Sequence, residues 1–376
     1  MSQQVLPRSP GIDLLRGFSI LLVVVHHLGL RIPLHKTDAA QVLPVFLLKG
    51  LIYNGYEAVF LFFVVSGFLI TRHVLERDGA LAAVAWRSFY ARRVARIVPC
   101  LLALVAVLLC CHALGVPNYV FDKPGQTPLG ATLSALTFTL NVYEGNNGWL
   151  PGGWDVLWSL SVEEVFYLAF PWVCLTLGRT RWLVPALVLL VLSVPFTRAA
   201  IADNEIWSEK AYLPGMGAIA AGVLAALVRF RSGVPGVLAR RLMAVAGVAS
   251  LALIMFSGGW LWHAIHEGYL LMLIGAGMLL VLASPEGGQA MRGTGWLRAM
   301  GRASYEVYLT HMFVVFSLVG VARLTGTDKA WGWLWYAPAV LIAWALGYGV
   351  ATYLSEPANR WLRRRLLRPV SAAATA

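Results

Sequence analysis

The chain has 376 residues, of which 59% are hydrophobic and only 13% charged, and its net charge is +12. In a soluble domain about a quarter of all residues are charged. This composition therefore excludes an ordinary soluble enzyme and indicates a polytopic membrane protein. The arginines lie in short loops between apolar runs, which is the pattern that orients membrane proteins and argues against nucleic acid as the partner.

Apolar runs predict an all-α integral membrane bundle of about ten transmembrane helices, forming a single domain over residues 1–376. The expected spans are 14–34, 56–72, 97–115, 156–177, 182–198, 212–229, 240–259, 265–284, 302–321 and 333–354. The apolar segment 129–143 is expected to be re-entrant or to lie on the outer interface, because one more crossing would place the later arginine-rich loops outside. The alternation of basic and acidic loops predicts that both termini are cytoplasmic, with a short tail at 357–376 that includes Arg368.

The first predicted span contains two ionisable residues, Arg16 and His27. They are eleven residues apart, which is three helical turns, so they share a face and lie about 16 Å apart along the axis. Charged residues at membrane depth are costly and are usually functional. The alternative is that Arg16 extends to the headgroups and that His27 is a hydrogen-bonded core residue. His26 points in another direction and is interpreted as a bystander.

Two adjacent acids occur in the fourth predicted span, which contains WSLSVEEVFYLAFPW (158–172). Counting from the predicted helix ends places Glu163 at the depth of His27. Successive helical residues point about 100° apart, so Glu163 and Glu164 cannot both face one partner. A carboxylate beside a histidine would make it a better general base. A structural ion pair or a protonated glutamate is the alternative.

Three arginines precede the third span, in the segment SFYARRVARIVP. Positive-inside topology alone explains Arg92, Arg93 and Arg96. A compact guanidinium cluster also suits a phosphate-rich ligand, because arginine binds phosphate through two hydrogen bonds.

A polar stripe opens the ninth span. Ser304, Tyr308 and His311 fall on one helical face, with Tyr305 and Glu306 beside it. Such stripes also serve to hold helices together in membranes. No histidine or cysteine pair has metal-ligand spacing, so no metal site is predicted.

Six motifs in this order resemble the acyltransferase-3 family of bacterial integral membrane O-acyltransferases. They are the pair Arg16 and His27, FFVVSGFLIT (62–71), FYARRVARIVP (89–99), WSLSVEEVFYLAFP (158–171), GRASYEVYLTH (301–311) and YLSEPANRWL (353–362). The resemblance covers nearly the whole chain. It implies transfer of an acyl group, typically acetyl, from cytoplasmic acyl-CoA to a hydroxyl of a sugar or glycoside on the outer side of the inner (plasma) membrane.

The resemblance also implies roles for individual residues. Arg16, Arg92, Arg93 and Arg96 would hold the phosphates of CoA. His27 would be the catalytic histidine, as a base or as the carrier of the acyl group, and Glu163 would orient it. Tyr305 and His311, with Ser304 and Tyr308 on the same stripe, would line the path of the acceptor or of the pantetheine arm. No permanently bound cofactor is implied.

One position departs from the family pattern. Ala58, Val59 and Phe60 stand where the family commonly has Gly-Val-Asp, so no role is carried over to Phe60. Many relatives add an outer hydrolase-like domain, and none is expected here. The competing hypothesis is a transporter of glycans or acylated metabolites, in which His27, Glu163 and His311 form a proton relay. The acyl chain, the acceptor and the oligomeric state are left open by the sequence.

Overall fold

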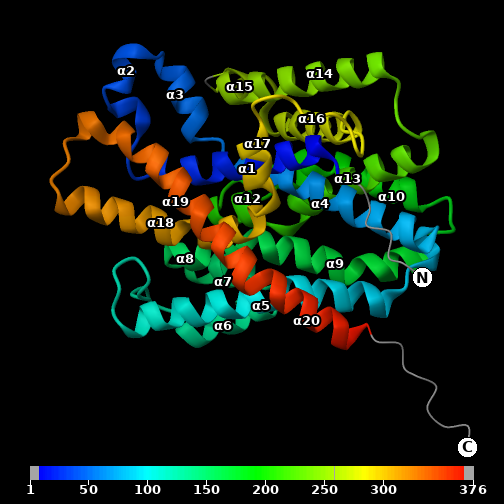
Figure 1. Cartoon of the computed structure of the whole chain (residues 1–376), viewed down its shortest axis with the longest axis horizontal. Helices are drawn as coiled ribbons and strands as arrows, with labels where there is room; N and C mark the ends of the chain where they lie inside the picture. Colours follow the sequence, from blue (N-terminus) through cyan, green and yellow to red (C-terminus); the bar gives the residue numbers. More distant parts are fainter. Residues whose placement is uncertain (1–7, 258, 368–376) are drawn as a thin grey trace, which may run out of the picture.

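The computed structural model describes residues 8–257 and 259–367, which form helices, turns and loops without a β-strand. The helices run roughly parallel to one another in a bundle (Figure 1). In this described part, nine helical segments are long and apolar enough to cross a membrane. Their central helices are α1 (Pro10–Gly29), α4 (Gly55–Asp78), α5 (Trp86–Ala113), α9 (Leu157–Leu177), α13 (Tyr212–Ser232), α14 (Val237–Phe256), α16 (Tyr269–Leu282), α18 (Ser304–Leu324) and α19 (Tyr336–Val350). The predicted all-α polytopic membrane bundle is confirmed.

The predicted span 182–198 is shorter than the others and is built from two helices. α10 (Leu183–Leu192) is apolar but has only ten residues, and α11 (Val194–Ala199) follows directly after Ser193. The apolar segment 129–143 forms no span. It falls into α6 (Pro128–Leu136) and α7 (Leu140–Asn147), each about 12–14 Å long at 1.5 Å per residue and so too short to cross.

The start of α1 and the end of α20 (Glu356–Leu366) lie at the same end of the bundle, on the right in Figure 1. The predicted tail therefore begins as a helix, and its residues from Arg368 onward lie outside the described residues. We call this end the arginine-rich end, since arginines gather at the last turns of α4, α13 and α20, at the first turns of α5 and α14, and in the turns after α9 and α16.

Glycines allow the central helices to make backbone contact. A Cβ at Gly67 of α4 would lie 2.0 Å from the carbonyl oxygen of Ile219 on α13, and one at Gly222 would lie 2.1 Å from that of Val64. α1 packs in the same way against α17 (Gly295–Arg302), where a Cβ at Gly301 would lie 2.0 Å from the Asp13 carbonyl. Small residues drive helix packing in membranes because backbones can then approach closely. Gly301 thus brings the start of α18 against α1.

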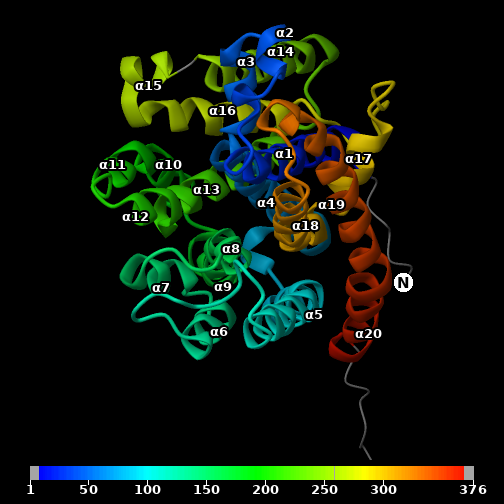
Figure 2. The same cartoon turned by 90° about the vertical axis from the view of Figure 1, so that its left-hand side faces the viewer.

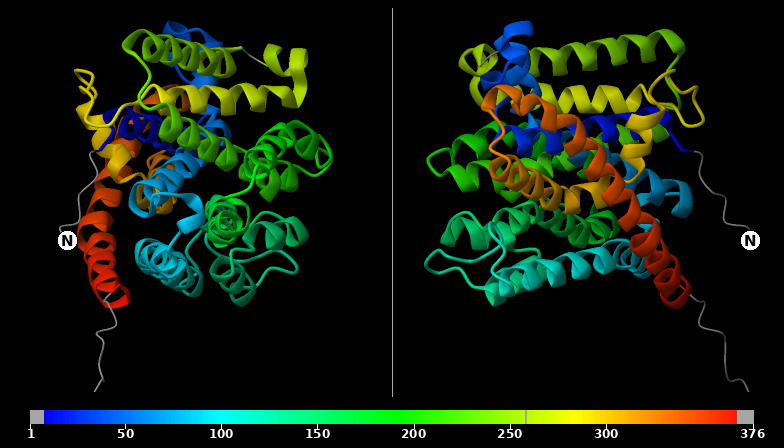
Figure 3. Two further views of the ribbon diagram at one scale, coloured as in Figure 1. Left: turned by 90° about the vertical axis from the view of Figure 1, so that its right-hand side faces the viewer. Right: turned by 60° about the vertical axis from the view of Figure 1, so that its left-hand side comes forward.

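The remaining helices surround this centre. α14 and α16 lie side by side at one edge, next to the short outer helices α2 (Ala39–Val42) and α3 (Val45–Ile52) (Figures 2 and 3). α20 runs beside α5. α19 reaches α20 through a π-helical turn over Ala351–Ser355. Turns of this kind are rare and often lie at functional sites, and here the turn presents Ser355 to α5.

Candidate active site

A cavity of about 320 Å³ lies in the centre of the bundle, between α1, α4, α5, α9 and α18. Its polar lining consists of Arg16, Ser66, His73, Arg93, Arg96, Ser159, Glu163, Tyr167, Ser304, Tyr305 and Tyr308. Its apolar lining consists of Val59, Phe62, Phe63, Val65, Leu69, Ile97, Leu160 and Leu309. Seven of the ten residues predicted for the site therefore border one space. The other three are His27, His311 and Arg92.

Arg16 is held by the start of α18. Its Nε and Nη2 atoms donate to Oγ of Ser304 over 3.2 and 2.9 Å. This bond depends on the close approach of α1 and α17 at Gly301. It leaves the guanidinium on the cavity wall with its charge unneutralised by any ion pair among the described residues. An arginine in this state can accept an anion from the cavity.

Arg96 is fixed and neutralised. It forms an ion pair with Oε1 of Glu306 over 2.7 Å and donates to Oγ of Ser355 over 3.1 Å, while Ser355 donates to the same carboxylate over 2.7 Å. The guanidinium also lies 5.1 Å from the centre of the Tyr305 ring. Tyr305 donates its hydroxyl hydrogen to the carbonyl of Ile97. This network joins α5, α18 and the π-helical turn into one wall of the cavity.

Arg93 has a different environment from its neighbour Arg92. Its guanidinium lies 4.0 Å from the centre of the Tyr167 ring, and within the described chain it makes no ion pair. Arg92 donates to Ser88 over 3.3 Å and does not line the cavity. The expected compact cluster of three arginines is therefore divided, because successive residues on α5 point in different directions. Arg93 and Arg96 face the cavity and Arg92 faces away from it.

The predicted pairing of Glu163 with His27 is wrong. Glu163 accepts a hydrogen bond from Ser66 on α4 over 2.7 Å and faces the cavity with Arg93. Over the described residues no hydrogen bond or ion pair joins Glu163 to His27. The depth estimate failed because α1 ends at Gly29 and not at residue 34. His27 is therefore two residues from the end of its helix, whereas Glu163 is six residues into α9, a difference of about 6 Å in depth.

Glu164 is buried, with 6% of its surface exposed, and does not line the cavity. Its Oε1 atom has no hydrogen-bond partner among the residues described. The helical argument that only one of the two acids can face the site is thus confirmed in the geometry of α9, with Glu163 as the acid that faces the cavity.

The partner of His27 is His311. Nε2 of His311 lies 3.3 Å from Nδ1 of His27. Nδ1 of His311 lies 2.7 Å from the carbonyl oxygen of Tyr308, and a carbonyl oxygen only accepts, so this Nδ1 carries the hydrogen and Nε2 is an acceptor. Nδ1 of His27 then faces two acceptors, the Val23 carbonyl at 2.9 Å and His311 Nε2. It therefore carries the hydrogen of the neutral ring.

This assignment leaves Nε2 of His27 with a lone pair. His27 is partly exposed, whereas His311 is fully buried. The neighbouring His26 is occupied elsewhere, with Nδ1 2.9 Å from the carbonyl of Ile52. A neutral imidazole held in one tautomer by its other nitrogen is suited to act as a general base or as a nucleophile. Tyr308 connects this pair to the cavity, since it lines the cavity and its ring centre lies 5.8 Å from that of His311.

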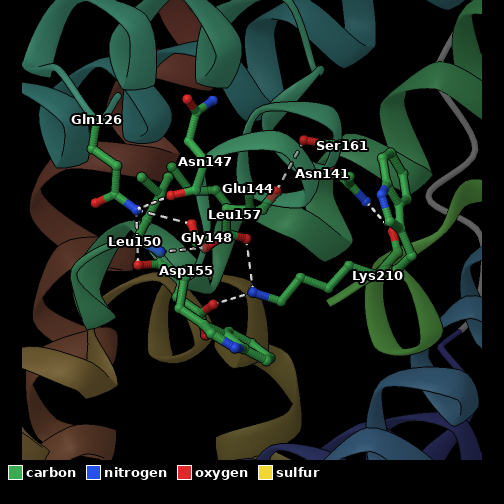
Figure 4. A network of polar contacts seen from close by, with 12 residues as sticks. Gln126, Asn141, Glu144, Asn147, Gly148, Leu150, Asp155, Leu157, Ser161 and Lys210 are labelled. Atoms are coloured by element: carbon green, nitrogen blue, oxygen red, sulfur yellow. Dashed lines mark hydrogen bonds and ion pairs between the residues drawn. The ribbon is translucent and has the colours of Figure 1, made fainter. Parts of the chain in front are cut away.

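A second buried polar network, missed in the sequence, joins Lys210 to Glu144 and Asp155 (Figure 4). Lys210 is 1% exposed and donates to Oε2 of Glu144 over 2.7 Å and to Oδ1 of Asp155. Glu144 also accepts from the backbone of Leu150 over 3.0 Å. Its burial, together with the nearby Asp155, raises the pKa of Glu144 to about 8, against the opposing effect of Lys210. The only sequence signal was a lysine at the start of an apolar span.

Within the described residues, no group of three or more His, Cys, Asp or Glu side chains has an arrangement suited to a metal ion. Phe60, the position that departs from the family pattern, is buried in an aromatic core, 4.8 Å from Tyr56 and 5.8 Å from Phe63 between ring centres. An aspartate there would be buried among these rings, so the phenylalanine is consistent with its surroundings.

Comparison with known proteins places this geometry in a family. The O-acetyltransferase OatA of Staphylococcus aureus strain NCTC 8325 is 27% identical over 170 residues, which are 44% of this chain and 24% of that protein. OatA of strain MRSA252 matches with the same values. The chain thus spans about a quarter of the length of the curated relatives it matches. No solved structure matches. The family model described as "Acyltransferase domain" matches residues 9–354, and the chain therefore belongs to the acyltransferase-3 family.

Proposed function

We propose that this protein is a membrane O-acyltransferase that moves an acyl group, acetyl in the simplest case, from cytoplasmic acyl-CoA to a hydroxyl of a sugar or glycoside. The observation that carries the proposal is the arrangement of one cavity. Arg16 and Arg93 border it, and Tyr308 in its wall contacts His311, which is paired with His27. A site for anions and a competent base are thus connected through the interior of a membrane bundle.

The donor site follows from charge and shape. Two guanidiniums without ion-pair partners in the described chain, Arg16 and Arg93, suit the phosphates of CoA. Phe62, Phe63 and Leu69 supply an apolar wall for the pantetheine arm. Arg96 supports this wall and contributes less direct charge, because Glu306 neutralises it. Arg92 does not line the cavity. It either contacts the ligand at the cytoplasmic opening of the cavity or serves only to orient the protein in the membrane.

His27 supplies the chemistry. Its Nε2 takes the proton of the acceptor hydroxyl while the hydroxyl oxygen attacks the thioester carbonyl carbon. The C–S bond then breaks, and the CoA thiolate leaves with the proton returned by the imidazolium. Nε2 of His311 stabilises the imidazolium by accepting a hydrogen bond from Nδ1–H of His27, the role that the sequence predicted for Glu163. The same free Nε2 serves the alternative in which His27 carries the acyl group between donor and acceptor.

The orientation is part of the proposal. The basic loops put the arginine-rich end in the cytoplasm together with both termini, as expected for the inner membrane of a bacterial cell. The donor then enters from the cytoplasm and the acceptor from outside. The relatives are named O-acetyltransferases, which supports acetyl as the group and a hydroxyl as the acceptor.

The test is a transfer assay with the purified protein in detergent or proteoliposomes. Acetyl-CoA is supplied with a panel of sugars and glycosides, and the release of the CoA thiol is followed. The mass of the acetylated product is measured by mass spectrometry. We expect thiol release that requires an acceptor and a product heavier by one acetyl group. Movement of a glycan across the vesicle membrane without consumption of acetyl-CoA would instead show the transporter.

A further inference from the structure

A second cavity, of about 220 Å³, lies at the arginine-rich end, between α4, α13 and the turn that follows α16. It shares no lining residue with the central cavity. It is lined by Phe68, Arg72, Leu75, Glu76, Ala226, Arg229, Phe230, Gly233, Val234 and Glu286. Nothing in the proposed transfer reaction uses it.

The charged residues of this cavity form a balanced set of two cations and two anions. Arg72 bonds Glu76 over 2.7 Å and Glu286 over 3.2 Å, and Arg229 bonds Glu286 over 3.1 Å. Glu286 stays ionised, because its own backbone amide and the two guanidiniums outweigh burial and lower its pKa. The cluster therefore offers positive and negative groups side by side in a small space.

Arg229 is incompletely satisfied. Its surface is only 9% exposed, yet Nη1 has no hydrogen-bond partner among the described residues. A buried guanidinium nitrogen without a hydrogen-bond partner destabilises the folded protein, and a bound ligand that accepts its hydrogen bond would remove this cost. Its other terminal nitrogen holds Glu286, and the residue lines the cavity, so a small shift of the side chain would bring Nη1 to a ligand oxygen.

The mouth of the cavity is apolar. Phe230 and Val234 are 52% and 55% exposed at the end of α13 and just beyond it, and Phe68 and Leu75 lie deeper and are buried. A polar cluster with an exposed apolar rim, at the end of membrane-spanning helices, matches the level at which lipid headgroups meet acyl chains.

We propose that this cavity binds the headgroup of a zwitterionic phospholipid that carries a primary amine. The phosphodiester lies against Arg229 and Arg72, the ammonium group donates to Glu76, and an acyl chain covers Phe230 and Val234. Because the two arginines and two glutamates already balance one another, a free phosphate would add net negative charge to the cavity. An anionic phospholipid would add net negative charge in the same way, and a choline headgroup has no N–H to donate to Glu76.

Delipidated protein in detergent tests the proposal by thermal unfolding. It is titrated with mixed micelles containing phosphatidylethanolamine, phosphatidylcholine or phosphatidylglycerol, and separately with inorganic phosphate. We expect phosphatidylethanolamine to raise the midpoint most, Arg229→Gln to abolish that rise, and Arg231→Gln, exposed two residues further on, to keep it. Equal stabilisation by all three lipids, or unchanged stabilisation of Arg229→Gln, overturns the proposal.

Glu76→Gln covers the case in which Arg229→Gln does not fold, since Glu76 lies at the exposed rim. This variant should bind phosphatidylethanolamine and phosphatidylcholine equally well, because the acceptor for the ammonium group has lost its charge. A preserved preference for phosphatidylethanolamine overturns the assignment of the amine. If inorganic phosphate stabilises the protein as much as any lipid does, the proposal that the ligand is a lipid is overturned, and the cavity is a simple anion site.

Discussion

The central cavity and the Lys210 network both bury charge in an apolar bundle, but they differ in how completely the buried charges are paired. In the network, Lys210 has two carboxylate partners, and Glu144 is bonded further by a backbone amide. In the cavity, Arg16 and Arg93 have only a serine and an aromatic ring as partners among the described residues. A buried charge whose partners are complete holds structure, whereas an incompletely paired charge on a cavity wall is available for a ligand.

The location of the two regions supports this distinction. The network joins three short helices through Glu144 of α7, Asp155 of α8 (Gly152–Asp155) and Lys210 of α12 (Glu205–Lys210) (Figure 4). The cavity is surrounded by five long helices and connects to the histidine pair. Substitutions in the network should therefore change stability, and substitutions in the cavity should change kinetics.

The largest expected effect is that of His27→Ala, which should reduce acyl transfer by about 10²–10⁴-fold, the range for loss of a general base. The variant should be inserted and unfold at the wild-type temperature. The measurement is thiol release from acetyl-CoA with the acceptor present, and His263→Ala, at an exposed position, is the control. Activity within twofold of wild type would remove His27 from the mechanism.

Above about pH 8, where Glu144 is ionised, Lys210→Met should destabilise the protein by roughly 3–5 kcal/mol, because it leaves the buried Glu144 carboxylate without its cation. The double variant Lys210→Met with Glu144→Met should recover much of that loss, since both buried charges are then gone. Thermal and chemical unfolding in detergent provide the measurement. If Lys210→Met kept full stability but lost transfer activity, the network would belong to the active site.

Arg93→Gln and Arg92→Gln compare neighbouring arginines that differ in whether they reach the cavity. Loss of a charged hydrogen bond of roughly 1.5–3 kcal/mol should raise KM for acyl-CoA about 10–100-fold in Arg93→Gln. Arg92→Gln should change KM by less than about threefold, because Arg92 lies outside the cavity and a partly exposed charge of this kind is worth under about 1 kcal/mol. Steady-state kinetics over a range of acetyl-CoA concentrations measures both. Equal effects would mean that the phosphates bind at the mouth.

Glu163→Gln and Glu164→Gln repeat the comparison on α9. Glu163→Gln should reduce kcat/KM by roughly tenfold, because it removes a charge-assisted bond to Ser66 beside the cavity arginines. Glu164→Gln should leave kcat/KM close to the wild-type value, since Glu164 does not reach the cavity. Kinetics of both purified variants decides the matter, and a larger loss in Glu164→Gln would reverse the assignment on α9.

The smallest effect concerns pH. Burial raises the pKa of Glu144 from 4.5 to about 8 in the folded protein. A raised pKa means that the folded state binds the proton more tightly than the unfolded state, so this contribution to stability is lost as pH rises from about 4.5 through about 8. The unfolding midpoint should therefore decline over that window in the wild type and less in Glu144→Gln. A steeper decline in the variant would contradict the raised pKa.

Much of the site could be predicted from helical periodicity. It places Ser304, Tyr308 and His311 on one face of α18, and in the structure each of them turns toward α1, α9 or the cavity. It also separates Glu163 from Glu164. These relations are local, because the rise and turn of a helix determine which side chains share a face.

The relations between helices could not be predicted in the same way. The pairing of His27 with His311 depends on where α1 ends, and the predicted end, five residues too late, placed His27 at the depth of Glu163. The bond between Arg16 and Ser304 requires backbone contact at Gly301. The link from Arg96 to Ser355 requires a π-helical turn.

The sequence by itself determined the membrane bundle, the resemblance to the family and the faces of the helices. Apolar length, charge placement and helical period are properties of each segment alone. Only the tertiary structure decided which faces meet, which arginines keep free charge, and that Lys210 is buried between two acids. These depend on helix ends and on close packing between segments distant in the chain, for which no local pattern exists.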